Sequence, residues 1–152
     1  EISWIDWSLL EKNKDLFEFF KFMIDYRKKH PVIRKKLDNA VCGMEAMHAH
    51  DVNAERMEVP QNAKTLAVSF AGYDRKKGKD DLVYVAVNAY WEEVKITLPN
   101  LANHGAWYLS VDTYGDENGK YCYEEGEEIR IDHEYVMKPR SIVVFTGRQV
   151  LR

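Results

Sequence analysis

The stretch that decides the fold is residues 65–88, which read TLAVSFAGYDRKKGKDDLVYVAVN. Its two ends, 65–70 and 82–88, are rich in Val, Ala, Tyr and Phe and follow a period of two, which is typical of β-strands. The charged residues 75–81 between them contain Gly78 and predict a turn. The sequence therefore predicts an antiparallel hairpin in the middle of the chain.

The same pattern continues towards the C-terminus. Residues 94–98 alternate between apolar and polar side chains and end at Pro99. Further short strands are predicted at 107–112, 120–123, 128–131 and 141–146, separated by Asn-Gly, Glu-Gly and Lys-Pro pairs. Short strands at this spacing favour an antiparallel Greek-key β-sandwich of about seven or eight strands, preceded by an N-terminal helical segment.

The helical segment is dominated by one long helix, predicted over residues 14–30, after a cap at Asn13 and before Pro31. Its apolar side chains cover roughly 220° of a helical wheel, about twice the usual core-facing stripe. They are Leu16, Phe17, Phe19, Phe20, Phe22, Met23, Ile24 and Tyr26. A helix of this kind packs on two sides. We therefore expect the chain to be the C-terminal fragment of a larger protein that supplies the second partner.

Composition excludes several classes of function. The chain has 152 residues, of which 45% are hydrophobic and 31% charged, so it is long enough for a domain with a real core. The net charge of −3 gives no indication of the positively charged surface that binds nucleic acid. No apolar run approaches the ~20 residues of a membrane-spanning helix. Cys42 and Cys122 lie far apart and outside any metal spacing, which favours two buried thiols over a disulfide.

Three stretches resemble one family. Residues 1–9, EISWIDWSL, with the Phe-rich helix and YRKKHPVIR at 26–34, resemble the end of the catalytic barrel in bacterial glycogen-debranching enzymes. These are the isoamylase and pullulanase type within the α-amylase family of glycoside hydrolases. NAYWE at 88–92, followed by ITLP at 96–99, resembles a strand pair of their C-terminal sandwich. PRSIVVF at 139–145 resembles its closing strand.

The resemblance implies domain boundaries and a function. Residues 1–35 would be the last loop and final helix of the barrel, 36–63 a linker, and 64–152 the C-terminal β-sandwich domain. The parent would be an α-1,6-glucosidase that debranches glycogen or related α-glucans without a cofactor, with its catalytic carboxyls on barrel strands upstream. The fragment itself would be structural, with the barrel and the α-glucan as partners. Its location would be cytoplasmic, or secreted if the parent is a pullulanase.

The residues of this chain offer no catalytic or metal site of their own. Retaining hydrolysis needs two carboxyls about 5 Å apart across a cleft, whereas adjacent glutamates on a strand point to opposite faces. Three such pairs occur, Glu92-Glu93, Glu124-Glu125 and Glu127-Glu128. His48 and His50 would share one face of a strand and could chelate zinc, but no third ligand follows at a fixed spacing.

The candidates for sugar contact are Trp4, Trp7, Trp91 and Trp107. Trp4 and Trp7 belong to the stretch that resembles the barrel end and could wall its cleft, Trp4 being the stronger candidate. The other two could form a platform on the sandwich. Neighbours on a strand face opposite ways, so we expect one residue of Tyr90-Trp91 and one of Trp107-Tyr108 to lie in the core.

Two other functions are compatible with the sequence. The chain could be a free-standing carbohydrate-binding module, or an interaction domain whose Phe-rich helix binds a partner protein. In every case we expect the chain alone to self-associate through the 14–30 helix. The uncovered apolar positions would form a patch of roughly several hundred Å².

Overall fold

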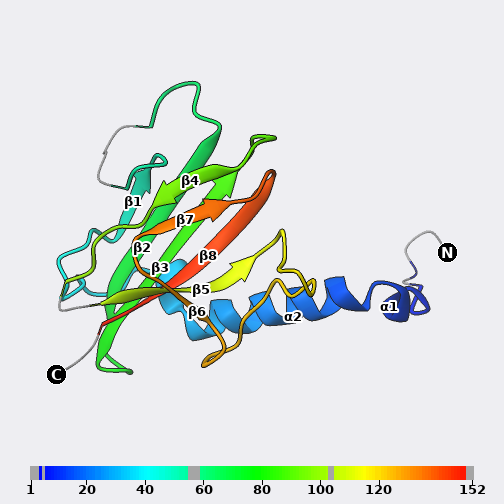
Figure 1. Ribbon diagram of the computed structural model, residues 1–152. Helices are drawn as coiled ribbons and strands as arrows, with labels where there is room; N and C mark the ends of the chain where they lie inside the picture. Colours follow the sequence, from blue (N-terminus) through cyan, green and yellow to red (C-terminus); the bar gives the residue numbers. More distant parts are fainter. Residues whose placement is uncertain (1–3, 5, 55–58, 103–104, 150–152) are drawn as a thin grey trace.

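The computed structural model describes residues 4, 6–54, 59–102 and 105–149. Its helices are α1 (Leu9–Lys12), α2 (Lys14–Lys29) and the 3-10 helix η1 (Pro31–Ile33). Its strands are β1 (Met47–His50), β2 (Thr65–Asp74), β3 (Lys79–Asn88), β4 (Val94–Thr97), β5 (Ala106–Asp112), β6 (Ile129–Ile131), β7 (Glu134–Met137) and β8 (Ser141–Arg148). The prediction of a mainly β fold with a helical lead-in is confirmed (Figure 1).

The strands form two antiparallel sheets. The larger has six strands in the order β1-β2-β3-β8-β5-β6, and the smaller consists of β4 and β7. The predicted hairpin lies in the larger sheet and consists of its two longest strands. These strands, β2 and β3, pair without interruption from Thr65↔Asn88 to Asp74↔Lys79. The hairpin is longer than expected because residues 79–81, predicted as turn, belong to β3. β8 returns from the end of the chain to lie between β3 and β5.

Two strand predictions need correction. Residues 120–123 form no strand and make only a single bridge, between Cys122 and Val111 of β5. In contrast, β7 was not predicted, although it pairs with β4 to make the second sheet. The burial of its four residues alternates, with Glu134 and Val136 on the exposed side. Val136 is apolar, however, so the sequence does not alternate between polar and apolar residues and gives no strand signal.

The large sheet is buried on both of its faces, and β3 shows this residue by residue. Tyr84 and Leu82 belong to the core between the two sheets, whereas Val83 faces the other way and packs in a second core. Strands buried on both faces read as continuous apolar runs, which is what residues 82–87 are. The two sheets are also linked by a hydrogen bond of 2.7 Å from the Tyr135 hydroxyl to Asp112.

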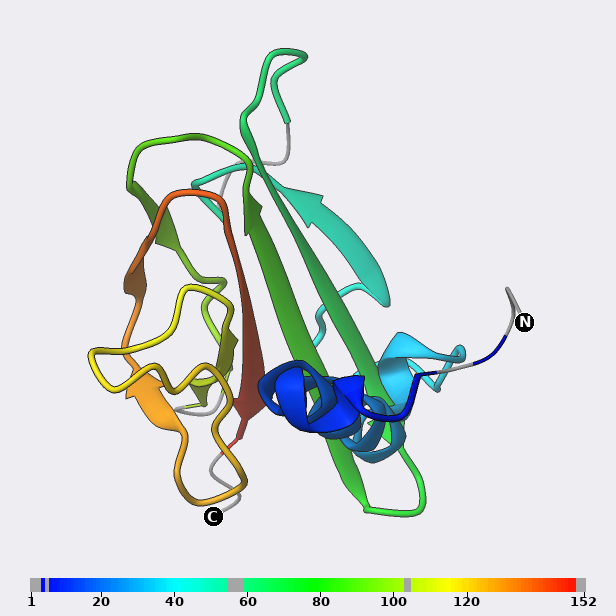
Figure 2. The same cartoon turned by 90° about the vertical axis from the view of Figure 1, so that its right-hand side faces the viewer.

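The second core lies between the large sheet and α2. Tyr26 of α2 is buried there with Val83, Val111 and Val144 of the sheet. Phe19, Phe22 and Met23 pack against the same core. Figures 1 and 2 show α2 running across this face of the sheet, with α1 extending past the last strand. None of the helices formed by the described residues has the length and apolar character needed to cross a bilayer.

The cysteines are free thiols, and they contact different cores. Cys42 packs against the core between the sheets and Cys122 against the core under α2. Burial raises the pKa of the Cys122 thiol to about 11, so this side chain is a neutral, unreactive thiol at physiological pH.

Candidate functional site

The side of α2 that faces away from the sheet carries an apolar strip, which we call the outer face of α2. It consists of Leu16, Phe17, Phe20 and Ile24, whose exposed fractions run from 48% to 58%. Residues four apart lie above one another on a helix, so these side chains form one continuous surface. The prediction that the helix is apolar on two sides is confirmed. One side packs on the sandwich, and none of the residues that the structure describes covers the other.

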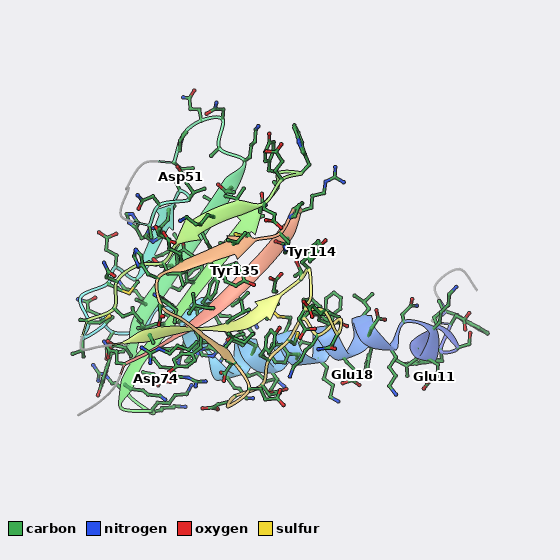
Figure 3. The ribbon with its side chains drawn as sticks, viewed as in Figure 1. Glu11, Glu18, Asp51, Asp74, Tyr114 and Tyr135 are labelled. Atoms are coloured by element: carbon green, nitrogen blue, oxygen red, sulfur yellow. The ribbon has the colours of Figure 1, made fainter. Side chains whose placement is uncertain are left out.

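The apolar surface continues towards the N-terminus. Leu9 and Leu10 of α1 are exposed, and so are Trp4 and Trp7, at 80% and 74%. Figure 3 labels Glu11 and Glu18 on this helical arm, part of which projects beyond the strands. Trp4 and Trp7, proposed as cleft residues, therefore lie at the far end of the outer face, away from the sandwich.

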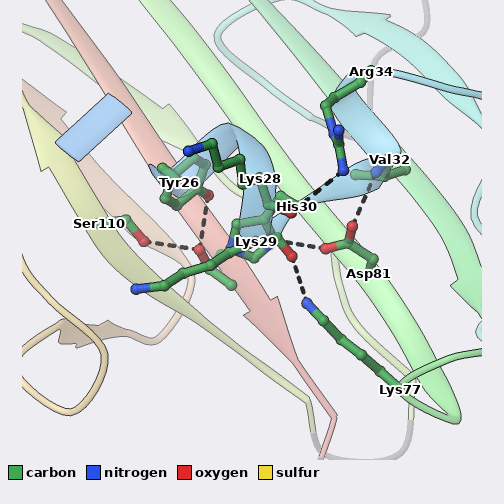
Figure 4. A network of polar contacts seen from close by, with 10 residues as sticks. Tyr26, Lys28, Lys29, His30, Val32, Arg34, Lys77, Asp81 and Ser110 are labelled. Atoms are coloured by element: carbon green, nitrogen blue, oxygen red, sulfur yellow. Dashed lines mark hydrogen bonds and ion pairs between the residues drawn. The ribbon is translucent and has the colours of Figure 1, made fainter. Parts of the chain in front are cut away.

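The C-terminal end of α2 is fixed to the sheet by a buried polar network (Figure 4). The hydroxyl of Tyr26 lies 2.8 Å from that of Thr146 on β8, which is 2.8 Å from that of Ser110 on β5. Burial raises the pKa of Tyr26, so its phenol stays protonated and can donate. One turn further on, His30 Nδ1 lies 2.6 Å from the carboxylate of Asp81.

Two neighbouring aspartates of β3 hold the segment that follows α2. Asp81 accepts a hydrogen bond from the Val32 backbone N–H at 3.0 Å, in addition to its contact with His30. Asp80 accepts from the backbone N–H groups of Val41 and Cys42, at 2.8 and 2.9 Å. Each carboxylate thus satisfies backbone donors in the segment between α2 and β1, whose bridge to the sheet is that of Asp38 with Tyr73 of β2. Together they position η1 and residues 41–42 against the hairpin.

A cavity of about 420 Å³ lies beside this network, between α2, the β2–β3 hairpin and the connection from β5 to β6. Several of its charged groups pair with one another. Lys29 pairs with Asp25 at 3.0 Å and Glu124 at 3.6 Å, and Arg148 pairs with Glu128. These three carboxylates each have a cationic partner.

A second exposed feature follows β3. Tyr90 and Trp91 lie side by side with ring centroids 4.2 Å apart and planes inclined by 40°, and we call them the aromatic platform. Trp91 is 64% exposed. The Lys64 ammonium lies 3.8 Å from the Tyr90 ring centroid and 5.3 Å from that of Trp91. The expectation that these two rings face opposite ways is wrong, because β3 ends at Asn88 and strand alternation does not apply beyond it.

The turn that carries the platform is held by the buried side chain of Asn88. Its amide nitrogen donates to the carbonyl oxygens of Glu92 and Lys138, at 2.9 and 3.0 Å. Its amide oxygen accepts from the Tyr90 N–H at 2.9 Å. The Tyr90 carbonyl in turn accepts from the Arg140 N–H at 3.0 Å. The backbone on both sides of the rings is therefore tied to the start of β8.

Trp107 does not belong to any platform. Its ring is 2% exposed and packs against Tyr84, with centroids 5.8 Å apart. Its indole N–H donates to the Pro99 carbonyl at 2.7 Å, which satisfies the one polar atom of the ring. Tyr108 points to the other face of β5, where the Arg148 guanidinium lies 4.7 Å from its centroid. As expected for neighbours on a strand, one member of this pair is core.

His48 and His50 lie close together, with ring centroids 4.7 Å apart. Both nitrogens of the buried His50 are engaged, Nε2 with the Ser69 hydroxyl at 2.9 Å and Nδ1 with the Ala54 carbonyl at 3.1 Å. His48 pairs with Glu45 at 3.0 Å. Within the described ranges no group of three or more His, Cys, Asp or Glu side chains is placed to hold a metal. The geometry of His50 fixes the edge strand β1 to β2.

The family described as Isoamylase, C-terminal matches residues 40–146. The chain belongs to the isoamylase C-terminal family. This confirms the resemblance that the sequence suggested, and it identifies a non-catalytic domain of glycoside hydrolases. The match includes all of β1 to β7 and most of β8, and it leaves α1, α2 and η1 outside. A comparison with curated proteins found no match.

Sequence reasoning missed the residues that hold this site together. The sequence predicts a charged turn that includes Asp80 and Asp81, and it includes Asn88 in the NAYWE stretch without giving it a role. One signal was available for Asp81, since it directly precedes the continuous apolar run of residues 82–87 and so begins a buried strand. Charged side chains at such positions are rarely buried unless they have a partner.

Proposed function

We propose that this chain is the C-terminal part of an α-1,6-glucosidase that debranches glycogen or related α-glucans, and that its own role is structural. One observation carries the proposal. The family match begins at residue 40, and the helices before it pack on the matched domain with only one of their two apolar sides. A helix that belongs to a neighbouring domain and lies in the interface between the two would have these properties.

In this proposal residues 1–35 form the last loop and helix of the catalytic barrel, 36–63 link it to the sandwich, and 64–152 are the C-terminal domain. The outer face of α2 docks on the barrel, and Asp80 and Asp81 keep the helix and linker in place. Burying a large apolar side chain that is half exposed contributes roughly 1 kcal/mol. The four residues of the outer face together would therefore supply a substantial part of the contact between the domains.

The test uses the longer protein that contains this chain together with the catalytic domain. Phe20→Glu places a charge at the centre of the docked surface, where burying it unpaired costs several kcal/mol, on the order of 3 or more. We expect this variant to lose thermal stability and most of its release of reducing ends from glycogen. Lys14→Glu is the matched control, because it adds negative charge on the polar side of the same helix.

Two results would contradict the proposal. One is a Phe20→Glu protein as stable and active as the Lys14→Glu control. The other is a parent protein that cleaves no α-1,6 linkage in glycogen or pullulan. The location that we propose follows from the substrate: cytoplasmic for a glycogen enzyme and secreted for a pullulanase.

A further inference from the structure

We infer that the aromatic platform, Tyr90 and Trp91, is a binding site for an α-glucan chain. The inference rests on the proposed function only for the kind of polysaccharide. Its physical basis is independent of it, and consists of an open aromatic ring, a rigid turn that presents the ring, and polar groups around it.

The first observation is that the ring is exposed on a turn that is not free to move. Asn88 is 1% exposed, and its side-chain amide bonds three backbone groups on both sides of the platform. The Ala89 N–H also donates to the Lys64 carbonyl at 2.9 Å, which ties the turn to the start of β2. A ring held in this way pays little conformational entropy when a ligand stacks on it.

The second observation is the arrangement of the two rings. Their planes are inclined by 40° at a centroid distance of 4.2 Å, so they form a small, angled apolar surface. The Lys64 ammonium, 3.8 Å from the Tyr90 centroid, lies over that ring, which leaves Trp91 as the more open of the two. The C–H face of a glucose ring stacks on an open indole, whose π face is electron-rich. The Lys64 ammonium can then donate to the sugar hydroxyls.

The third observation concerns position. The platform follows the C-terminal end of β3, whereas Asp81 and the end of α2 lie near its start. Asn88 lies seven positions along the strand from Asp81, which corresponds to about 24 Å. Figure 1 shows the β3–β4 connection at the opposite end of the strand from the β2–β3 hairpin. The platform is therefore not a continuation of the outer face of α2.

The surroundings of the platform favour a sugar over a protein partner. A stable protein interface buries about 800 Å² on each side around an apolar centre. Here two rings lie among charged side chains, namely Lys64, the exposed Glu92, and the ion pair of Glu93 with Lys138 at 2.5 Å. A small aromatic surface within a polar rim suits a polyhydroxylated chain, which needs both stacking and hydrogen-bonding groups.

The experiment is affinity electrophoresis of the complete 152-residue chain in gels with and without glycogen, followed by calorimetric titration with maltoheptaose. We expect glycogen to retard the chain and Trp91→Ala to weaken binding by about tenfold. Tyr114→Ala is the matched control, since it removes an aromatic ring of similar exposure, 60%, from the segment after β5, and its binding should be unchanged. Circular dichroism of each variant establishes that the fold is retained.

Three outcomes would overturn the inference. The chain could migrate equally with and without glycogen, Trp91→Ala could bind as the parent chain does, or Tyr114→Ala could be the variant that loses binding. These outcomes are distinct from failure of the proposed function. Binding at Trp91 in a protein without debranching activity would indicate a carbohydrate-binding module. If the parent protein debranches glycogen but the 152-residue chain does not bind it, the chain would have only the docking role.

Discussion

His50 makes the stability of this fold depend on pH. It is buried on β1 between the Ser69 hydroxyl and the Ala54 carbonyl, and burial lowers its pKa below the usual 6.5, with a further contribution from the charge of nearby His48. The unfolded chain therefore takes up the proton before the folded one does. The sign follows from this difference: the stabilisation is complete above pH 6.5 and is lost as the pH falls through the lower, folded pKa.

We predict that the urea midpoint of the chain falls between pH 7 and pH 5, and that His50→Gln falls less over the same range. Comparison of the two proteins removes the contributions of the other titrating groups. Parallel curves for the two proteins would show that His50 does not carry the pH dependence. The β1 edge should be the first part of the sheet to lose amide protection in acid.

Single residues also show where sequence reasoning succeeded and where it did not. Trp107 and Tyr108 obey strand alternation, which depends only on local geometry. Tyr90 and Trp91 do not, because the position of the last strand residue, Asn88, is set by hydrogen bonds to residues up to 50 positions away. No local pattern contains that information, so the aromatic platform could be suspected from its residues but not constructed from them.

Among the elements, α2 depends on β3 for its position. Its buried side chains provide adhesion to the sheet, but Asp81 defines where the helix ends, because it binds both His30 and the Val32 N–H. We predict that Asp81→Asn, which keeps the size of the side chain but removes its charge, destabilises the chain by about 1–2 kcal/mol. It should also increase hydrogen exchange at residues 26–33.

The control for this change is Asp132→Asn, since the side chain of Asp132 is 94% exposed and makes a surface ion pair with Arg130 at 3.6 Å, which contributes little to stability. The control should leave both stability and exchange unchanged. If Asp81→Asn altered exchange across the whole sheet rather than at the end of α2, the carboxylate would be a general core element and not a helix anchor.

The elements themselves were predictable to different degrees. The hairpin of residues 65–88 and the helix of residues 14–30 carry strong periodicity over a long stretch, and both were found. Strand β7 has only four residues and a pattern that fits neither period, so it could be recognised only through its pairing with β4. The stretch 120–123 has the composition of a strand, but its pairing with β5 is limited to the single bridge between Cys122 and Val111.

For the molecule as a whole, the exposed outer face of α2 affects how the chain associates in solution. We predict that the 152-residue chain self-associates with rising concentration, because apolar side chains on adjacent turns can bury one another between two copies. Sedimentation velocity over a range of concentrations measures this directly. The double variant Phe17→Glu/Ile24→Glu should remain monomeric, whereas Lys14→Glu should associate like the parent chain.

A chain that stays monomeric at high concentration and binds no apolar dye would contradict this prediction and would weaken the docking role of α2. The two-sided helix was the part of the architecture that could be deduced most directly from the sequence. What the sequence could not supply was which side chains belong to which partner. That division depends on the direction in which the helix crosses the sheet.

Because β3 serves two cores at once, the family's sequence boundary is not the boundary at which the fold can be cut. Transfer of residues 40–146 alone into another protein would remove the helix that covers Val83, Val111 and Val144. These three aliphatic side chains would then be exposed to water. A graft that begins at residue 9 would include the helix that covers these side chains. Shuffling of this module during evolution would face the same constraint, so the helix and the sandwich should be inherited together.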